Sequence, residues 1–118
     1  MYKDWHQIAD ELPRLFDEIK EGTPDVAKHF AGLARAASSD GALKHRYKEL
    51  MALAIGIAVR CEGCIALHAR AAARAGATRE EVLETVGMAT YMGGGPAFGY
   101  GAQAVEAFDQ FQDRSRQQ

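Results

Sequence analysis

The ten residues "LMALAIGIAV", Leu50 to Val59, form the longest apolar run in this chain of 118 residues. Glu49 and Arg60 bound the run on either side. A helix needs about 20 apolar residues to cross a bilayer, so this run is too short for that and predicts a buried helix. We expect it in a helix from about Leu43 to Val59, at the centre of the fold.

Upstream of this run the sequence has helical periodicity, and no segment alternates with the period of two that indicates a strand. Thr23 followed by Pro24 is a helix start signal, in which Thr caps the helix and Pro occupies its first turn. Two helices are therefore expected, one ending near Gly22 and one reaching the "SSDG" break at 38–41. The first has one apolar stripe, made of Ile8, Leu12, Leu15, Phe16 and Ile19.

Downstream of the run three more helices are expected. The first begins around the two cysteines and stops at Gly76. The second begins at Thr78, whose spacing to Glu81 matches a capping box, and the third follows "MGGGP" at 92–96. The prediction is an all-α fold of six helices, organised as a single domain over residues 1–118.

Charge and composition exclude several classes of protein. The formal net charge is −2 and the pI is near 6.1, which gives no electrostatic reason to bind nucleic acid. The N-terminal residues are amphipathic and of mixed charge, unlike a secretory signal. We expect a cytoplasmic protein without nucleic-acid or membrane partners.

The chemistry concentrates in "RCEGCIALH", Arg60 to His68, which holds both cysteines of the chain. Cys61, Cys64 and His68 follow at spacings of three and four residues, so they share one helix face. This arrangement fits a redox dithiol, half of a metal site, or two core residues. If a helix begins at Cys61, its dipole favours a thiolate there, and His68 can accept a proton from Cys64. We favour the redox dithiol, because close cysteines in a reducing cytoplasm are seldom a structural staple.

Glu49 is the other candidate residue of this site. If the central helix and the cysteine helix form an antiparallel hairpin that turns near Arg60, Glu49 lies roughly 16 Å back from the turn at about 1.5 Å per residue. His68 lies roughly 12 Å forward on the same scale. The two side chains would meet at similar depth. We therefore expect a Glu–His–Cys relay, in which the carboxylate orients the imidazole.

A metal centre is not expected. Zinc sites typically gather four ligands, and beyond this motif the chain offers only His6, His29 and His45, without a second close pair. An arrangement of three ligands around an open position is the one metal alternative.

The segments "ELMALAIGIAVRCEGCIALHARAAARAGATREEVLE" (49–84) and "MATYMGGGPAFGYGAQAVEAFDQF" (88–111) resemble the carboxymuconolactone decarboxylase superfamily, specifically its alkylhydroperoxidase-D-like members. The resemblance implies that Cys64 attacks a peroxide and that Cys61 resolves it as a disulfide. It assigns His68 and Glu49 to the proton relay. It also implies an external dithiol reductant, such as a dihydrolipoyl group on a partner protein, no bound cofactor, and a homo-oligomer, first a hexamer and second a trimer.

One position departs from that pattern, because Gly63 stands where alkylhydroperoxidase D has a histidine. The substitution removes one member of the proton relay but leaves the dithiol. The predicted function is a thiol-disulfide oxidoreductase acting as a peroxidase. The alternatives are a decarboxylase or lactone-processing enzyme with incidental cysteines, and a non-catalytic helical assembly module.

Overall fold

The structure is a computed structural model that describes residues 1–117, with side chains described for residues 1–113. This part of the chain is built of six helices, and it contains no strand. The predicted all-α fold is therefore confirmed. The helices are α1 (Trp5–Gly22), α2 (Pro24–Ser38), α3 (His45–Ala58), α4 (Glu62–Arg74), α5 (Arg79–Gly93) and α6 (Gly95–Gln117).

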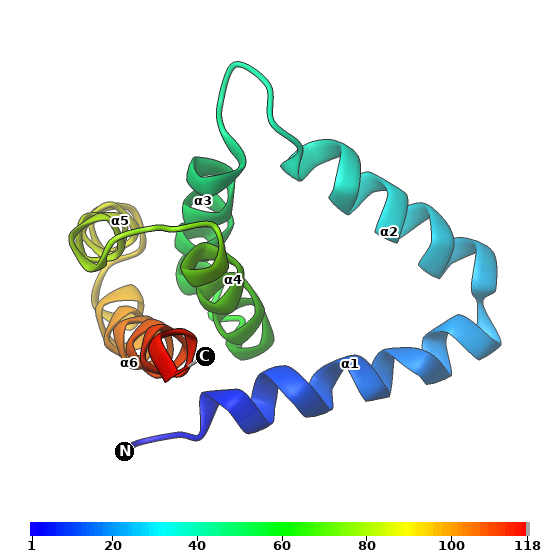
Figure 1. Cartoon of the computed structure of the whole chain (residues 1–118), viewed down its shortest axis with the longest axis horizontal. Coiled ribbons are helices and arrows are strands. Elements are labelled where there is room, and N and C mark those ends of the chain that lie inside the picture. Colours follow the sequence, from blue (N-terminus) through cyan, green and yellow to red (C-terminus); the bar gives the residue numbers. More distant parts are fainter. Residues whose placement is uncertain (118) are drawn as a thin grey trace.

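Helices α3 to α6 pack together as a bundle, and α3 and α4 form a hairpin within it (Figure 1). The turn between them is centred on Arg60, whose φ of 60° lies in the left-handed region. The two helices are antiparallel, because α4 begins where α3 ends and Cys61 donates its backbone N–H to the Gly56 carbonyl. The largest fully buried side chains of the bundle are Leu53, Ile57, Ile65, Val82 and Phe108.

The N-terminal residues are held against α6 by a single carboxylate. Glu106 accepts hydrogen bonds from the backbone N–H groups of Tyr2 (2.7 Å) and Lys3 (2.9 Å) and from the indole Nε1–H of Trp5 (2.8 Å). These bonds place the Trp5 ring in the core, where it is fully buried. The beginning of α1 is thereby fixed to the bundle.

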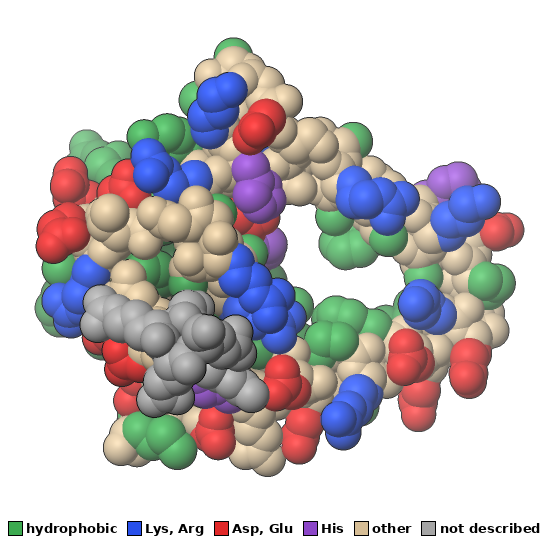
Figure 2. Space-filling view, in the orientation of Figure 1, with side chains coloured by type: hydrophobic (Ala, Val, Ile, Leu, Met, Phe, Trp, Pro, Cys, Tyr) green, Lys and Arg blue, Asp and Glu red, His purple; other side chains and the backbone are tan. Residues whose placement is uncertain are grey.

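The rest of α1 and all of α2 form what we call the arm, residues 10–38. No residue of α2 is buried, and the last buried residue of α1 is Ala9. In Figure 1 the two helices of the arm extend away from the bundle and meet at an angle. Figure 2 shows a gap through the molecule between the arm and the bundle. Six large apolar side chains of the arm are exposed: Leu15, Phe16, Ile19, Val26, Phe30 and Leu33.

The central helix is less buried than its sequence predicts. Leu50, Leu53 and Ile57 lie in the core, but Met51, Ile55 and Val59 are exposed. These three follow at intervals of four residues and so form one stripe along α3. The expectation of a fully buried helix is wrong for this stripe, because α4, α5 and α6 cover only part of the circumference of α3.

The predicted helix boundaries at threonine have different outcomes. Thr78 and Glu81 make the reciprocal hydrogen bonds of a capping box, as expected. Thr23 occupies the N-cap position of α2, but its hydroxyl donates to the carbonyl of Ile19 and makes no cap bond. Thr23 therefore closes α1 instead of capping α2.

None of the helices in the described part of the chain combines the length and the apolar character needed to cross a membrane.

Candidate active site

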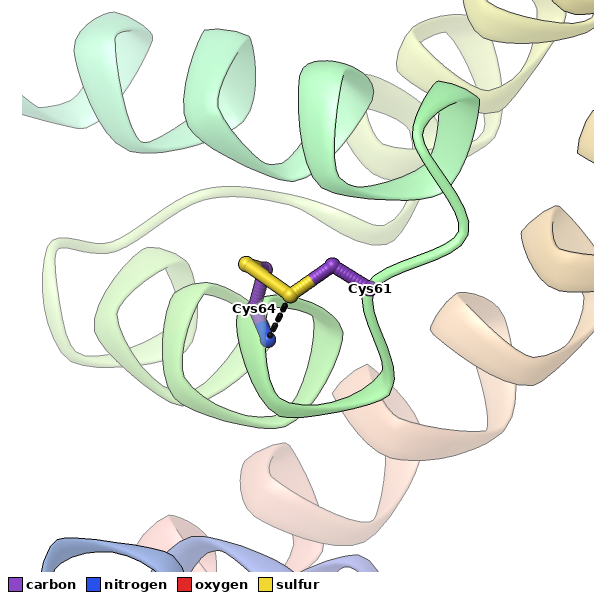
Figure 3. The surroundings of a disulfide bond; sticks show 2 residues. All are labelled: Cys61 and Cys64. Carbon is purple, nitrogen blue, oxygen red and sulfur yellow. Dashed lines mark hydrogen bonds between the residues drawn. A yellow bond between two sulfur atoms is a disulfide. The ribbon is translucent and has the colours of Figure 1, made fainter.

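The two cysteines lie at the start of α4, where they form a disulfide (Figure 3). Cys61 is the N-cap residue, and its sulfur accepts the backbone N–H of Cys64 at 3.2 Å. The first N–H groups of a helix lack partners within the helix and carry its positive dipole end. The same N–H is therefore in place to stabilise a thiolate on Cys61 when the disulfide is reduced.

Close packing of the hairpin holds this motif in place. A Cβ atom added to Gly56 of α3 would lie 2.9 Å from the Cβ of Cys64, closer than side chains approach one another. The α3 backbone therefore lies directly against the second cysteine. Gly56 makes that approach feasible because it has no side chain.

Glu49 and His68 are in contact, as expected from their similar distances from the turn of the hairpin. The Nδ1 atom of His68 lies 2.8 Å from Oε2 of Glu49, whose residue surface is only 6% exposed. The carboxylate is the acceptor, so Nδ1–H is the donor and Nε2 is left for proton exchange. The His68 side chain is 37% exposed, so solvent reaches part of the ring.

Within the described residues, the His68 ring makes no hydrogen bond to either sulfur. The predicted Glu–His contact is thus present, whereas the last link of the relay, from His68 to Cys64, is not formed in this oxidised state. The physical reason is that disulfide sulfurs carry no exchangeable proton and accept hydrogen bonds weakly.

His45 is a neighbour of this site that the sequence analysis did not assign to it. Its Nε2 lies 3.8 Å from Oε1 of Glu49, and its Nδ1 lies 2.7 Å from the carbonyl oxygen of Ser38, to which it donates. The buried carboxylate therefore lies between two imidazoles. The signal in the sequence was the spacing, since His45 precedes Glu49 by one helical turn.

The structure also explains how the chain accommodates Gly63. A Cβ atom on Gly63 would collide with the side chain of Leu12, which reaches over the motif from α1. The space that a histidine side chain would enter from position 63 is thus occupied by an apolar residue of the arm.

The negative charge of Glu62 in the first turn of α4 is paired with Lys3, a residue far away in the sequence. Lys3 forms an ion pair with Glu62, between the two cysteines, and donates to Gln103 of α6 at 2.9 Å. The hydrogen bond to Glu62 is the main cause that raises the pKa of Lys3 above its ordinary value. The carboxylate nearest to the sulfurs in sequence is therefore paired with a cation.

Among the residues whose side chains are described, no three His, Cys, Asp or Glu side chains gather closely enough to hold a metal ion.

The sequence matches known proteins over most of its length. Residues 24–107 match the family model of the carboxymuconolactone decarboxylase family. An uncharacterized protein of Cupriavidus necator is 35% identical over 109 residues, which cover 92% of this chain and 96% of that protein. An uncharacterized protein from the cox locus of Paracoccus denitrificans is also 35% identical, covering 79% of this chain and 84% of its own.

Solved structures share the fold. A carboxymuconolactone decarboxylase family protein of Legionella pneumophila superposes with a TM-score of 0.88 at 42% identity, covering 92% of this chain and 96% of that one. A protein of the same family from Thermotoga maritima, for which a role in the antioxidative response has been suggested, gives a TM-score of 0.82 at 26% identity. That match covers 94% of each chain.

Proposed function

The chain belongs to the carboxymuconolactone decarboxylase family, and we propose that within it the protein is a thiol-disulfide oxidoreductase that reduces hydroperoxides. The observation that carries this proposal is the Cys61–Cys64 disulfide at a helix N-terminus, one turn before a histidine bonded to a buried glutamate. The antioxidative role suggested for the Thermotoga maritima relative supports it. Cysteines without a redox role would need neither a helix N-terminus nor a nearby histidine–glutamate pair.

The proposed reaction starts from the reduced dithiol. His68 accepts the proton of Cys64, and Glu49 stabilises the imidazolium that results. The Cys64 thiolate attacks the terminal peroxide oxygen, the O–O bond breaks, and the alkoxide leaves as the alcohol after taking up a proton from His68. Cys64 is then a sulfenic acid.

The second step closes the disulfide. The Cys61 thiol gives up its proton, and its thiolate, favoured by the N–H groups of the first turn of α4, attacks the sulfenic sulfur of Cys64. The S–O bond breaks, and the leaving hydroxide takes up the proton released by Cys61 and departs as water. The Cα atoms of the two residues are 5.2 Å apart in the disulfide, a usual separation for this bond. The turn at the start of α4 accommodates the oxidised state of the pair.

An external dithiol completes the cycle by thiol-disulfide exchange. It gives up two electrons and two protons, becomes a cyclic disulfide, and returns Cys61 and Cys64 to thiols. We take a dihydrolipoyl group, free or on a partner protein, as this reductant. The cycle needs a compartment that keeps thiols reduced, so the proposal places the protein in the cytoplasm.

We further propose that the working form is a homo-oligomer, with a hexamer as the first candidate and a trimer as the second. The arm supports this proposal because no residue of α2 is buried within its own chain. Its side chains Phe16, Ile19, Val26 and Phe30 line an apolar groove of about 530 Å3. A second copy of the chain is the natural occupant, since most assemblies of this kind are built from identical subunits.

The test is consumption of cumene hydroperoxide by the purified protein with dihydrolipoamide as reductant. Cys64→Ser should abolish turnover, and Cys61→Ser should stop after a single turnover with a trapped sulfenic acid. Glu49→Gln keeps the size of the side chain but removes its charge, and it should lower the rate about 10- to 100-fold.

Two outcomes would contradict the proposal. Peroxide consumption that survives in Cys64→Ser would remove the assigned nucleophile. An activity toward lactones or β-keto acids that persists in the double variant Cys61→Ser/Cys64→Ser would favour the decarboxylase interpretation instead.

A further inference from the structure

A cationic groove lies beside the proposed relay, and neither the family resemblance nor the proposed cycle uses it. One part is a cavity of about 270 Å3 lined by Leu67, Arg70, Ala71, Arg74 and Ala75 of α4 and by His45 of α3. An adjoining cavity of about 460 Å3 shares His45 and Ala75 and adds Asp40, Lys44, Arg46 and Tyr47. The lining thus contains four Lys or Arg side chains and one carboxylate.

The groove continues the helix face that carries the chemistry. Cys64, His68, Ala71 and Ala75 follow at spacings of four, three and four residues, so they lie along one stripe of α4. On the facing helix, Gly56 lies against Cys64 and Glu49 against His68. His45, one turn before Glu49, then faces the alanine end of the stripe, where it lines both cavities.

This arrangement sets a length and a polarity for a ligand. The axial distance along α4 from Cys64 to Arg70 is roughly 9 Å at about 1.5 Å per residue, and Arg70 is also turned about 120° around the helix axis from Cys64. Between these two positions the partly exposed residues of α4 are Leu67 and His68, so the surface offers one aliphatic side chain and one imidazole ring. A ligand with its reacting group at Cys64 and an anionic group at the arginines would span this distance with an apolar chain.

The positive charge of the groove is incompletely compensated. Arg70 has a side chain only 24% exposed, and the nearest oxygen of its partner, Asp10 on α1, is 3.5 Å away. Burial is the main cause that lowers the pKa of Arg70, and the like charge of Arg74 lowers it further. Figure 2 shows Lys, Arg and His side chains on the α3–α4 side of the gap that separates the bundle from the arm.

The net charge of the whole chain is −2, so this concentration of positive charge is local. A bound anion would relieve the repulsion between the two guanidinium groups. Arginine pairs are suited to this task because their planar donors match the two oxygens of a carboxylate.

We propose that Arg70 and Arg74 bind the carboxylate of a substrate whose medium-length apolar chain lies along α4 and whose reacting group reaches Cys64. This inference rests on the proposed function for the identity of the reacting group. Two substrates share the required chemistry. One is a carboxylate-bearing hydroperoxide, and the other is free dihydrolipoate, whose thiols and carboxylate are separated by a chain of comparable length.

Binding is tested first, without any turnover, by calorimetric titration of the full-length protein with octanoate and with octanamide. These probes have the same chain and differ in charge. Octanoate should bind at least about 10-fold more tightly than octanamide, and the double variant Arg70→Gln/Arg74→Gln should lose this preference. Arg14→Gln, which removes an exposed charge from α1, is the matched control and should retain it. Equal binding of the two probes by the unaltered protein would overturn the proposal.

Kinetics then identify which substrate carries the carboxylate. One arm compares dihydrolipoate with dihydrolipoamide while tert-butyl hydroperoxide is the oxidant. The other compares a carboxylate-bearing hydroperoxide with its methyl ester while dihydrolipoamide is the reductant. The charged form should have the higher kcat/KM in one arm, and the double variant should bring that ratio close to one.

The two proposals fail in different ways. If neither the uncharged pair nor the charged substrates give turnover, the proposed function is wrong, and the octanoate titration still decides the groove. If the uncharged pair turns over and neither arm prefers the charged form, the groove has no role in substrate binding and the inference is overturned.

Discussion

The hairpin of α3 and α4 and the arm, residues 10–38 of α1 and α2, are both pairs of helices, but only the hairpin is closely packed. In the hairpin, Gly56 lets the two backbones touch at Cys64, and a buried carboxylate joins the helices at His68. In the arm, α2 has no buried residue, and Phe30 is 70% exposed. The candidate site residues are therefore brought together within one chain, whereas the apolar face of the arm is exposed in that chain.

The difference shows where stability comes from in each region. Isolated helices of this length are marginal in water, and most helical stability in proteins comes from packing of an apolar face. The hairpin obtains that packing from α5 and α6. The arm has an equally clear apolar face, but its large apolar side chains are exposed. In the proposed homo-oligomer, another copy of the chain would cover them.

The largest expected effect comes from a charge on the apolar face of the arm. Phe30→Asp should break the assembly, because a central aromatic residue of an interface typically contributes about 2 kcal/mol or more. Light scattering should show a smaller species, and circular dichroism should show a loss of helix no larger than the helix content of the arm. The redox pair should still close its disulfide, because the hairpin does not depend on Phe30.

Lys28→Ala, which changes an exposed charge on the same helix, is the control and should leave the assembly intact. An unchanged molar mass for Phe30→Asp would show that the arm is not an interface between copies.

A smaller effect is expected from adding a side-chain atom where α3 and α4 touch. Gly56→Ala would place a methyl group against Cys64 and should cost about 1 to 3 kcal/mol of unfolding free energy. Gly87→Ala is the matched control, since a Cβ on Gly87 meets nothing within 4 Å and should stabilise α5 by about 0.5 to 1 kcal/mol. Chemical denaturation of both variants measures these values. Equal effects would mean that the close approach of α3 and α4 is not a constraint.

The smallest effect concerns Glu106 of α6, which holds the N-terminal residues against the bundle through its hydrogen bonds. The pKa of Glu106 is lowered in the folded protein, chiefly by the hydrogen bond from the Tyr2 N–H. Between that lowered pKa and the ordinary value of 4.5 the unfolded state binds more protons, so stability rises with pH in this window. The contribution is complete above the window and is lost as the pH falls through the folded pKa.

Glu106→Gln should therefore cost about 1 kcal/mol or less at neutral pH, since the group is near the surface. The difference in unfolding free energy between this variant and the unaltered protein should shrink as the solution is acidified below pH 4.5. Thermal unfolding at several pH values measures it. A difference that stays constant through this range would show that the charge of Glu106 does not hold the N-terminal residues against α6.

Local signals in the sequence predicted most of the hairpin. The spacing of Cys61, Cys64 and His68 indicated one helix face, and the distances of Glu49 and His68 from the turn indicated their contact. Both predictions need only the rise of a helix and a turn near Arg60, and these follow from covalent geometry. The assignment of catalytic roles to these residues remains a prediction.

The features that the sequence did not predict depend on the arrangement of the helices. The stripe of Met51, Ile55 and Val59 is as apolar as the buried side of α3, so composition alone could not tell that no other helix of the chain covers it. His45 lies in a basic run that is typical of a solvated helix face. Its place beside Glu49 follows from their spacing only once that carboxylate is known to be buried.

The contact of Leu12 with Gly63 links two positions that are far apart in the sequence. A larger residue at position 63 needs another rotamer of Leu12, a smaller residue at position 12 or a displaced α1, so the side chains at the two positions are coupled. A histidine before the second cysteine would therefore require the side chain at position 12 to move or to change. The choice of residue before the second cysteine is thus tied to a side chain of the N-terminal helix, fifty-one positions earlier in the sequence.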